Sequence, residues 1–165
     1  KDGVITCALF AEAAAWAAAQ GKSLLDLLIN IYVEYGYYKT RMVYVVKDGL
    51  AGEQEIKNMM DAYRRLRSGK IGGGKITKIN DYLERKSIDI VTGVGKRITL
   101  PKSNIIQFFL EDRSKITVRP SGTEPKIKYY FEVSSDLPNA ASFKKVDGIL
   151  TERIDQLEKA IINII

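Results

Sequence analysis

Two alternating segments joined by a loop with a proline near each end constrain the fold of this chain more than any other feature. Residues 114–119 and 126–133 each alternate between apolar and polar side chains, which is the period of a half-buried β-strand. Pro120 and Pro125 restrict the backbone of the loop between them. We therefore predict an antiparallel hairpin at a sheet edge, with a stiff loop at its tip.

The loop also carries the chemical groups that bind phosphate. Arg119 offers a two-pronged guanidinium, and Ser121 and Thr123 offer hydroxyls. Gly122 lets a ligand approach backbone N–H groups closely. Because the prolines already limit the loop, little ordering entropy is lost when a ligand binds. These residues predict a largely preformed anion site.

The segment Arg119-Pro-Ser-Gly-Thr-Glu-Pro-Lys-Ile-Lys128 resembles the C-terminal phosphate-binding signature of the α-D-phosphohexomutases, the phosphoglucomutase and phosphomannomutase enzymes. Upstream segments resemble the same family, so that the resemblance covers nearly all 165 residues: Lys1-Asp-Gly-Val4, Gly21-Lys-Ser-Leu-Leu-Asp-Leu-Leu28, Tyr35-Gly-Tyr-Tyr38 and Leu100-Pro-Lys-Ser-Asn104. It implies an α+β fold: the TBP-like C-terminal domain, a mostly antiparallel sheet with helices on one face.

The resemblance implies an isomerase that moves a phosphoryl group between C1 and C6 of a hexose phosphate through a phosphoserine enzyme. The C-terminal loop would hold the phosphate that is not reacting. The matching positions assign this role to Arg119, Ser121, Gly122 and Thr123. Lys128 stands where many members have a phosphate-contacting arginine, so the charge is kept but the fork is lost.

The catalytic loops of that family are absent from this sequence. It has no Ser-His-Asn-Pro, Asp-Gly-Asp-x-Asp-Arg or Gly-Glu-x-Ser-Gly type segment, and no histidine. The resemblance therefore predicts a C-terminal fragment without catalytic residues or metal ligands, inactive alone. Mg²⁺ and a hexose 1,6-bisphosphate activator are expected only for the full enzyme. The expected partners are a hexose phosphate and the N-terminal domains of the same chain, where the choice of glucose, mannose or pentose would be made.

The helical N-terminal part is expected to be the remnant of a third domain. Residues 3–20 form an alanine-rich helix with little polar face, which should be buried against something. Ser23 with Asp26 forms a capping box that starts a second helix. We therefore predict residues 1–36 as the helical remnant and residues 37–165 as the C-terminal phosphate-binding domain.

Within residues 37–165 the periodicity predicts five elements. These are strands at about 39–46, 76–82 and 104–111, and helices at about 51–67 and 138–164. Residues 83–99 show no clear period and receive no assignment. Gly72-Gly-Gly74 is predicted to be a flexible connection. At the Asp112-Arg113 turn a glycine would be usual, so Arg113 either strains the turn or belongs to a longer loop.

Composition is typical of a globular domain, with 45% hydrophobic and 28% charged residues. No apolar run approaches the roughly 20 residues of a membrane span, and the start of the sequence has no signal pattern, so a cytoplasmic location is expected. The net charge is +6. Most basic side chains, including Arg64, Arg65 and Arg67 at a helix end, are expected to be solvated.

Two other functions remain open from the sequence. A basic α+β domain can bind nucleic acid, which would require exposed aromatic side chains interleaved with basic ones on the sheet. Tyr129 and Phe131 alternate as a core face should, and only Tyr130 lies between lysines. Alternatively, the alanine-rich helix makes this a non-catalytic interaction domain. We expect no nucleic acid and no membrane partner.

Overall fold

The computed structural model describes residues 2–47, 49–66 and 69–164. The chain divides into two compact units, one of Lys1–Tyr38 with Ser135–Ile149 and one of Lys39–Ser134 with Leu150–Ile165. Each unit is described by itself. The assignment of residues 1–36 and 37–165 to two domains of a longer protein stays a prediction.

The first unit begins with two helices, α1 at Gly3–Ala19 and α2 at Leu24–Tyr35, as the sequence predicted. The Asp2 carboxylate caps α1, and the Ser23–Asp26 capping box starts α2. Their axes meet at 89°, and Gly21 between them takes a φ of +67° that favours glycine. By length and composition, no single described helix spans a membrane, and only this bent pair passes the same test together.

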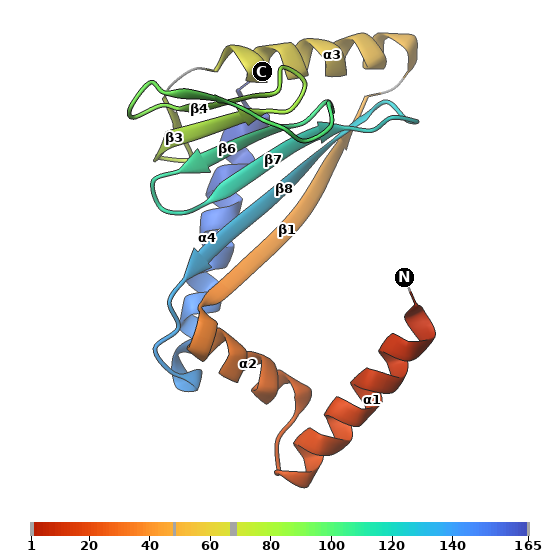
Figure 1. Ribbon diagram of the computed structural model, residues 1–165, viewed down its shortest axis with the longest axis vertical. Helices are drawn as coiled ribbons and strands as arrows, with labels where there is room; N and C mark the ends of the chain where they lie inside the picture. The colour runs from red at the N-terminus through yellow and green to blue at the C-terminus, as the bar shows by residue number, and fades with distance from the viewer. Residues whose placement is uncertain (1, 48, 67–68, 165) are drawn as a thin grey trace. The chain divides into compact units, whose positions relative to one another are not determined.

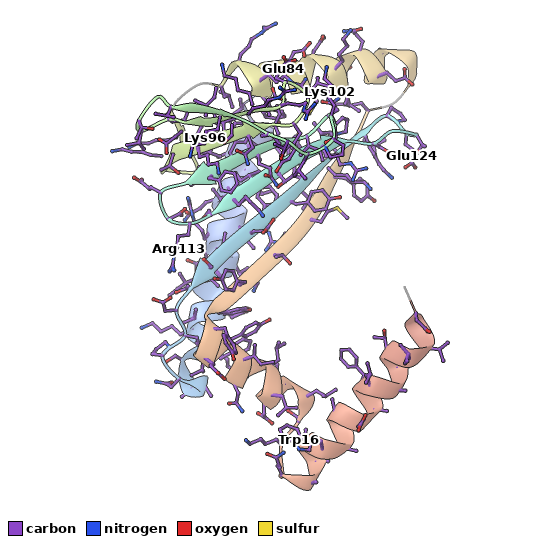
Figure 2. All side chains as sticks on the ribbon, in the orientation of Figure 1. Trp16, Glu84, Lys96, Lys102, Arg113 and Glu124 are labelled. Carbon is purple, nitrogen blue, oxygen red and sulfur yellow. The ribbon has the colours of Figure 1, made fainter. Side chains whose placement is uncertain are left out.

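The alanine-rich sequence of α1 forms the predicted helix, but the helix is not buried as expected. Ala17 is its one buried residue among those described. Phe10 is 62% exposed and Trp16, labelled in Figure 2, is 59% exposed. Within the described residues this helix is therefore not buried, because alanine supports a helix by propensity without needing a packing partner, and its expected burial against another part of a longer protein stays a prediction.

The rest of the first unit packs around aromatic rings. The Tyr37 ring stacks on Tyr32 at 4.3 Å and meets Phe143 at 5.4 Å between ring centroids. The Tyr37 hydroxyl donates a hydrogen bond to Asp147, and burial followed by that hydrogen bond raises the pKa of Tyr37. These contacts tie the end of α2 and the start of strand β1 to the short helix η1 and to α4, at Ala140–Ser142 and Phe143–Ile162.

The second unit is built on one antiparallel sheet (Figure 1). The strands run in the order β1-β8-β7-β6-β3-β4-β5, and β2 pairs with β3. Their bounds are Tyr37–Val46 for β1, Lys70–Ile71 for β2, Gly74–Asp81 for β3, Lys86–Asp89 for β4, Gly95–Arg97 for β5, Ile106–Leu110 for β6, Lys115–Pro120 for β7 and Lys126–Ser135 for β8. With helices α3, at Gly49–Arg65, and α4 the fold is α+β, as predicted.

Both helices cover the same face of the sheet. Strands β6, β7 and β8 alternate between buried and less buried residues, so that Phe108, Val118 and Tyr129 are fully buried on that face. The Tyr63 hydroxyl of α3 lies 3.0 Å from the Tyr129 hydroxyl and donates to the Ile161 carbonyl oxygen of α4. This contact joins α3, β8 and α4 in one core.

The hairpin predicted around the proline loop is confirmed as β7 and β8, but its place in the sheet differs from the prediction. We expected a sheet edge, whereas β8 pairs with β1 on one side and β7 pairs with β6 on the other. The loop therefore extends from the end of two interior strands. Strand β1 is the edge strand on that side of the sheet.

The structure changes or resolves four local predictions. Gly72 and Gly73, with φ of +54° and +82°, form the tight turn between β2 and β3 instead of a flexible connection. Arg113 takes a φ of +69°, so it occupies the left-handed position of the β6–β7 turn where glycine is usual. The unassigned segment 83–99 contains the short strands β4 and β5. The helix expected to end at residue 67 ends at Arg65, and residue 67 lies outside the described residues.

Candidate functional site

Backbone hydrogen bonds close the loop between β7 and β8. The Ser121 N–H donates to the Lys126 carbonyl at 2.8 Å, and the Lys126 N–H donates to the Glu124 carbonyl at 2.7 Å. The Lys47 N–H, just beyond β1, donates to the Pro125 carbonyl at 2.8 Å. The loop is thus fixed at its base and tied to a neighbouring strand, which favours a preformed conformation.

The Glu124 side chain also helps to hold the loop in place. Its carboxylate forms an ion pair with Lys126 inside the loop. The hydrogen bond and charge of Lys126, followed by the charge of Lys128, lower the pKa of Glu124. Figure 2 shows Glu124 at the exposed tip of the hairpin. One lysine near the loop is therefore already neutralised within the protein.

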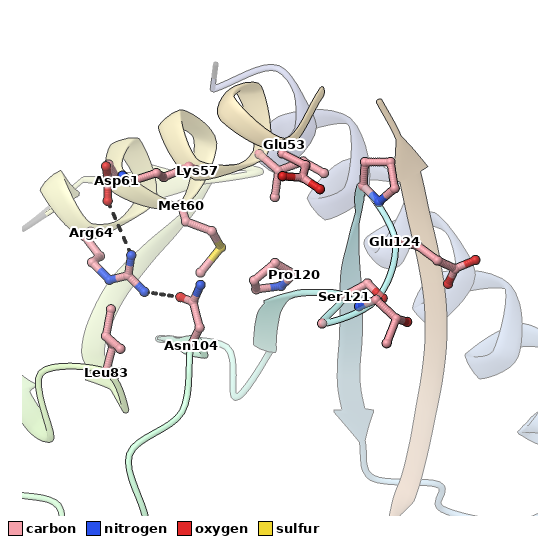
Figure 3. A pocket seen from close by; sticks show the side chains of 14 residues that line it. Glu53, Lys57, Met60, Asp61, Arg64, Leu83, Asn104, Pro120, Ser121 and Glu124 are labelled. Atoms are coloured by element: carbon pink, nitrogen blue, oxygen red, sulfur yellow. Dashed lines mark hydrogen bonds and ion pairs between the residues drawn. The ribbon is translucent and has the colours of Figure 1, made fainter. Parts of the chain in front are cut away.

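The loop forms one wall of a pocket of about 550 Å³ (Figure 3). Three predicted site residues line it: Ser121, Gly122 and Thr123. The facing wall comes from α3 and from two connecting segments, and its residues are Glu53, Ile56, Lys57, Met60, Asp61, Arg64, Leu83 and Asn104. A volume of this size accommodates a sugar phosphate.

The other two predicted residues lie on the opposite, open face of the sheet. Arg119 and Lys128 are directly paired across β7 and β8, and neither lines the pocket. Arg119 is exposed, and no hydrogen bond or ion pair of its guanidinium is found among the described residues. Two residues farther along the same face of β8, Tyr130 follows Lys128. The structure therefore brings together three of the five residues at the pocket and places two cations beside the base of the loop.

Gly122 is not required by the fold. A Cβ atom added there would meet no atom within 4 Å, and its φ lies outside the left-handed region. Neither steric crowding nor backbone strain explains a glycine at the tip of the loop. The space above its backbone is open to a ligand.

Arg64 is a residue of the pocket that the sequence reasoning missed. We expected a solvated cation at a helix end, but its side chain is 14% exposed. The Arg64 Nε lies 3.3 Å from the Asp81 carboxylate, which is itself buried, and the guanidinium also contacts Asp61 and Asn104. Nothing in the local sequence distinguishes Arg64 from its neighbours, because its partners are 3, 17 and 40 positions away.

Among the described residues, those that line the pocket offer donors and charged groups and include no histidine or cysteine. Hydroxyls, backbone N–H groups and cations suit the binding and orientation of an anion. Within the described residues, no group of three or more histidine, cysteine, aspartate or glutamate side chains is arranged to hold a metal ion. These residues therefore do not fit a Mg²⁺ ion.

The fold and the site together define a class of protein. It is an α+β domain with a braced, hydroxyl-bearing loop at the end of an antiparallel hairpin. The sequence model of the phosphoglucomutase/phosphomannomutase C-terminal domain matches residues 53–150. This chain belongs to that family. The match includes the whole loop and every residue that lines the pocket.

Phosphoglucomutases of staphylococci are among the similar proteins. The enzyme of Staphylococcus saprophyticus is 38% identical over 113 residues, which are 68% of this chain and 20% of that protein. The enzyme of Staphylococcus epidermidis is 32% identical over 149 residues, 90% of this chain and 27% of that protein. The chain thus spans about a quarter of the length of these relatives or less.

A solved structure is also similar. The open form of parafusin, a phosphoglucomutase from Paramecium, aligns with 82% of this chain and 23% of its own at a TM-score of 0.38 and 12% identity. These values are too low for an argument about the fold.

Proposed function

We propose that this chain is the phosphate-binding C-terminal part of a hexose phosphate mutase. In this proposal the loop holds the phosphate that is not reacting while a phosphoryl group moves between C1 and C6 elsewhere in the full enzyme. Ser121 and Thr123 donate hydroxyl hydrogen bonds, and Gly122 presents its backbone N–H. Arg119 and Lys128 supply positive charge from the base of the loop. Positioning and electrostatic stabilisation are most of what phosphoryl transfer requires of a protein.

The unexplained space at Gly122 is the observation that carries this proposal. A braced loop with hydroxyls on both sides of a glycine, open above its backbone, faces a pocket large enough for the ligand. The fold does not need that space, whereas a bound oxyanion does. Family membership supports the same role.

The proposal assigns the chemistry to the rest of a longer polypeptide. No described residue acts as nucleophile, so the 165-residue chain is expected to be inactive alone, and the hexose bisphosphate activator and Mg²⁺ are needed only by the full enzyme. We propose that the exposed apolar side chains of α1 and α2 pack against other domains of the same chain, in the cytoplasm. The identity of the sugar would be set there.

Three alanine variants of the chain test the loop. Gly122→Ala adds a methyl group where a ligand would lie, and Gly148→Ala adds one in open space on α4. Titration calorimetry with inorganic phosphate should show weakened binding for Gly122→Ala and unchanged binding for Gly148→Ala. Arg119→Ala should weaken binding by roughly 1.5–3 kcal/mol, the range for hydrogen bonds to charged groups. Equal affinities in all four proteins would overturn the proposal.

The nucleic-acid alternative has a specific but smaller basis. The Lys126 ammonium lies 5.6 Å from the centroid of the Tyr44 ring, on the open sheet face where Tyr44 is 59% exposed. The Lys78 ammonium, 5.0 Å from the centroid of the Phe109 ring, makes a second such pair. These are two pairs, whereas stacking surfaces use several aromatic side chains in succession. A salt-dependent mobility shift with a random single-stranded oligonucleotide, together with no response to phosphate, would favour this alternative.

A further inference from the structure

A fixed chain of polar contacts leads from the core of the second unit to the pocket. Asp81 is 5% exposed and lies 3.3 Å from the Arg64 Nε. A second carboxylate, that of Asp61, lies 3.5 Å from the Arg64 Nη1. The Asp81 contact is an ion pair without a hydrogen bond from Nε, so two acidic groups, one of them buried, flank the guanidinium and leave its Nη2 corner for a further partner.

The Nη2 atom of the Arg64 guanidinium orients the side chain of Asn104. The Arg64 Nη2 donates a hydrogen bond to the Asn104 Oδ1. Because a guanidinium only donates, the carboxamide must present its oxygen to Arg64. Its NH₂ group then faces away from the guanidinium (Figure 3), at a residue that lines the pocket. No hydrogen bond of this NH₂ group is found among the described residues, and Asn104 is exposed. Two donors are thus oriented in advance and accessible to a ligand.

The two walls of the pocket differ in their chemistry. The loop wall presents hydroxyls and backbone N–H groups, which suit an anion, and its Glu124 carboxylate is paired with Lys126. The α3 wall has no net charge, because Lys57 and Arg64 balance Glu53 and Asp61. Met60 and Leu83 add an apolar surface beside Asn104. A phosphate at the loop therefore leaves the uncharged, hydroxyl-bearing part of its ligand toward α3 and Asn104.

We propose that Asn104 is a further ligand-binding residue, whose NH₂ group donates a hydrogen bond to a hydroxyl oxygen of the sugar, and that Arg64 is its positioning residue. This inference rests on the proposed function, because it requires the phosphate of the same ligand to lie at the loop. It extends the binding site from the loop to the segment before β6 and assigns a binding role to the end of α3.

Two probes and a matched variant test the inference. Inorganic phosphate reports the loop alone, and glucose 6-phosphate reports the loop together with the sugar contact. Asn104→Ala should weaken glucose 6-phosphate binding about three- to tenfold, the size of one hydrogen bond, and leave phosphate binding unchanged. Asn58→Ala removes an exposed asparagine of α3 that does not line the pocket, and should change neither affinity.

A direct measurement keeps the test independent of how the variant folds. In ¹⁵N-labelled parent chain, the side-chain NH₂ resonances of Asn104 should shift with glucose 6-phosphate and not with inorganic phosphate. Arg64→Lys keeps the charge but loses the fork, so the two ligands should then give the same small response. If phosphate binds but Asn104→Ala and these resonances do not distinguish the two ligands, the inference is wrong and the proposed function stands. If neither ligand binds the parent chain, both are wrong.

Discussion

Arg119 lies directly opposite Lys128 in the β7–β8 ladder, so two cations face each other at the base of the loop. Like charges at directly opposed positions destabilise a sheet by roughly 0.2–1 kcal/mol relative to a neutral pair. Farther along the same two strands, Lys115 and Glu132 form an ordinary ion pair of 2.7 Å. The opposed cations Arg119 and Lys128 thus differ from the complementary pair Lys115 and Glu132, and a bound anion would stabilise them.

Replacing one of these cations should raise stability and lower affinity. Lys128→Glu converts the repulsion into a cross-strand ion pair, so the free energy of unfolding in urea should rise by about 0.2–1 kcal/mol. Phosphate binding by titration calorimetry should be lost. Lys128→Gln, which only removes the charge, should give intermediate values of both. If Lys128→Glu binds phosphate as tightly as the parent chain, Lys128 has no part in the site.

The buried hydrogen bonds of the Tyr63 hydroxyl should affect the stability of the fold and not the binding of phosphate. Its hydroxyl contacts the Tyr129 hydroxyl and the Ile161 carbonyl oxygen inside the core. Tyr63→Phe leaves these groups without one partner and should lower the free energy of unfolding by about 1–3 kcal/mol. Tyr44→Phe, at an exposed position, should change it by less than about 0.5 kcal/mol. Phosphate affinity should be unchanged in Tyr63→Phe, and a parallel loss of binding would contradict this separation.

The sequence alone predicted the helices and strands whose hydrophobic pattern lies within one short segment. The 3.6-residue spacing of Ile56, Met59, Met60 and Tyr63 predicted α3, and all four are buried. Strict alternation predicted β8 for the same reason. Strands β4 and β5, of four and three residues, bury no residue among those described, so they leave no period to recognise. They exist because β3 offers its backbone edge to β4, which is a tertiary cause.

The candidate site was predictable on one side only. The loop residues are contiguous, so that their chemistry is visible in the sequence as a single motif. The facing wall joins Arg64, Asp81 and Asn104, and no short motif can record contacts over such separations. For the same reason the sequence placed Arg119 and Lys128 with the loop, whereas alternation along β7 and β8 directs them to the open face of the sheet.

Exposed apolar side chains on α1 should make the 165-residue chain self-associate. Phe10 is 62% exposed and Trp16 is 59% exposed on the same helix, and clustered apolar surface of this kind marks an interaction site. Sedimentation velocity under reducing conditions, because Cys7 is also exposed, should show association that falls in the Phe10→Ser/Trp16→Ser double variant. Val91→Ser, which changes an isolated exposed side chain in the other unit, should have no effect. A monomeric parent chain would contradict the prediction.

Acid should weaken the turn between β6 and β7 through Asp112. This carboxylate accepts hydrogen bonds from the Ser114 N–H at 3.0 Å and from the Arg153 Nε at 2.7 Å. Burial on its own would raise the pKa of Asp112, but the hydrogen bonds from Ser114 and the charge of Arg153 lower it below its usual value. A lowered folded-state pKa means that the stabilisation is complete above the unfolded-state pKa of about 4 and is lost as the pH falls through the folded-state value.

Asp112→Asn should therefore be less stable than the parent chain at pH 7 and similar to it in acid. The Asp112 side chain is 37% exposed, so solvent screening limits the difference at pH 7 to about 1 kcal/mol or less. Urea unfolding from pH 2 to 7 should show the two curves converging below about pH 4. Glu12→Gln removes an exposed carboxylate on α1 and should stay within about 0.5 kcal/mol of the parent chain. A constant gap between the Asp112→Asn and parent curves would mean that this residue acts through packing and not through its charge.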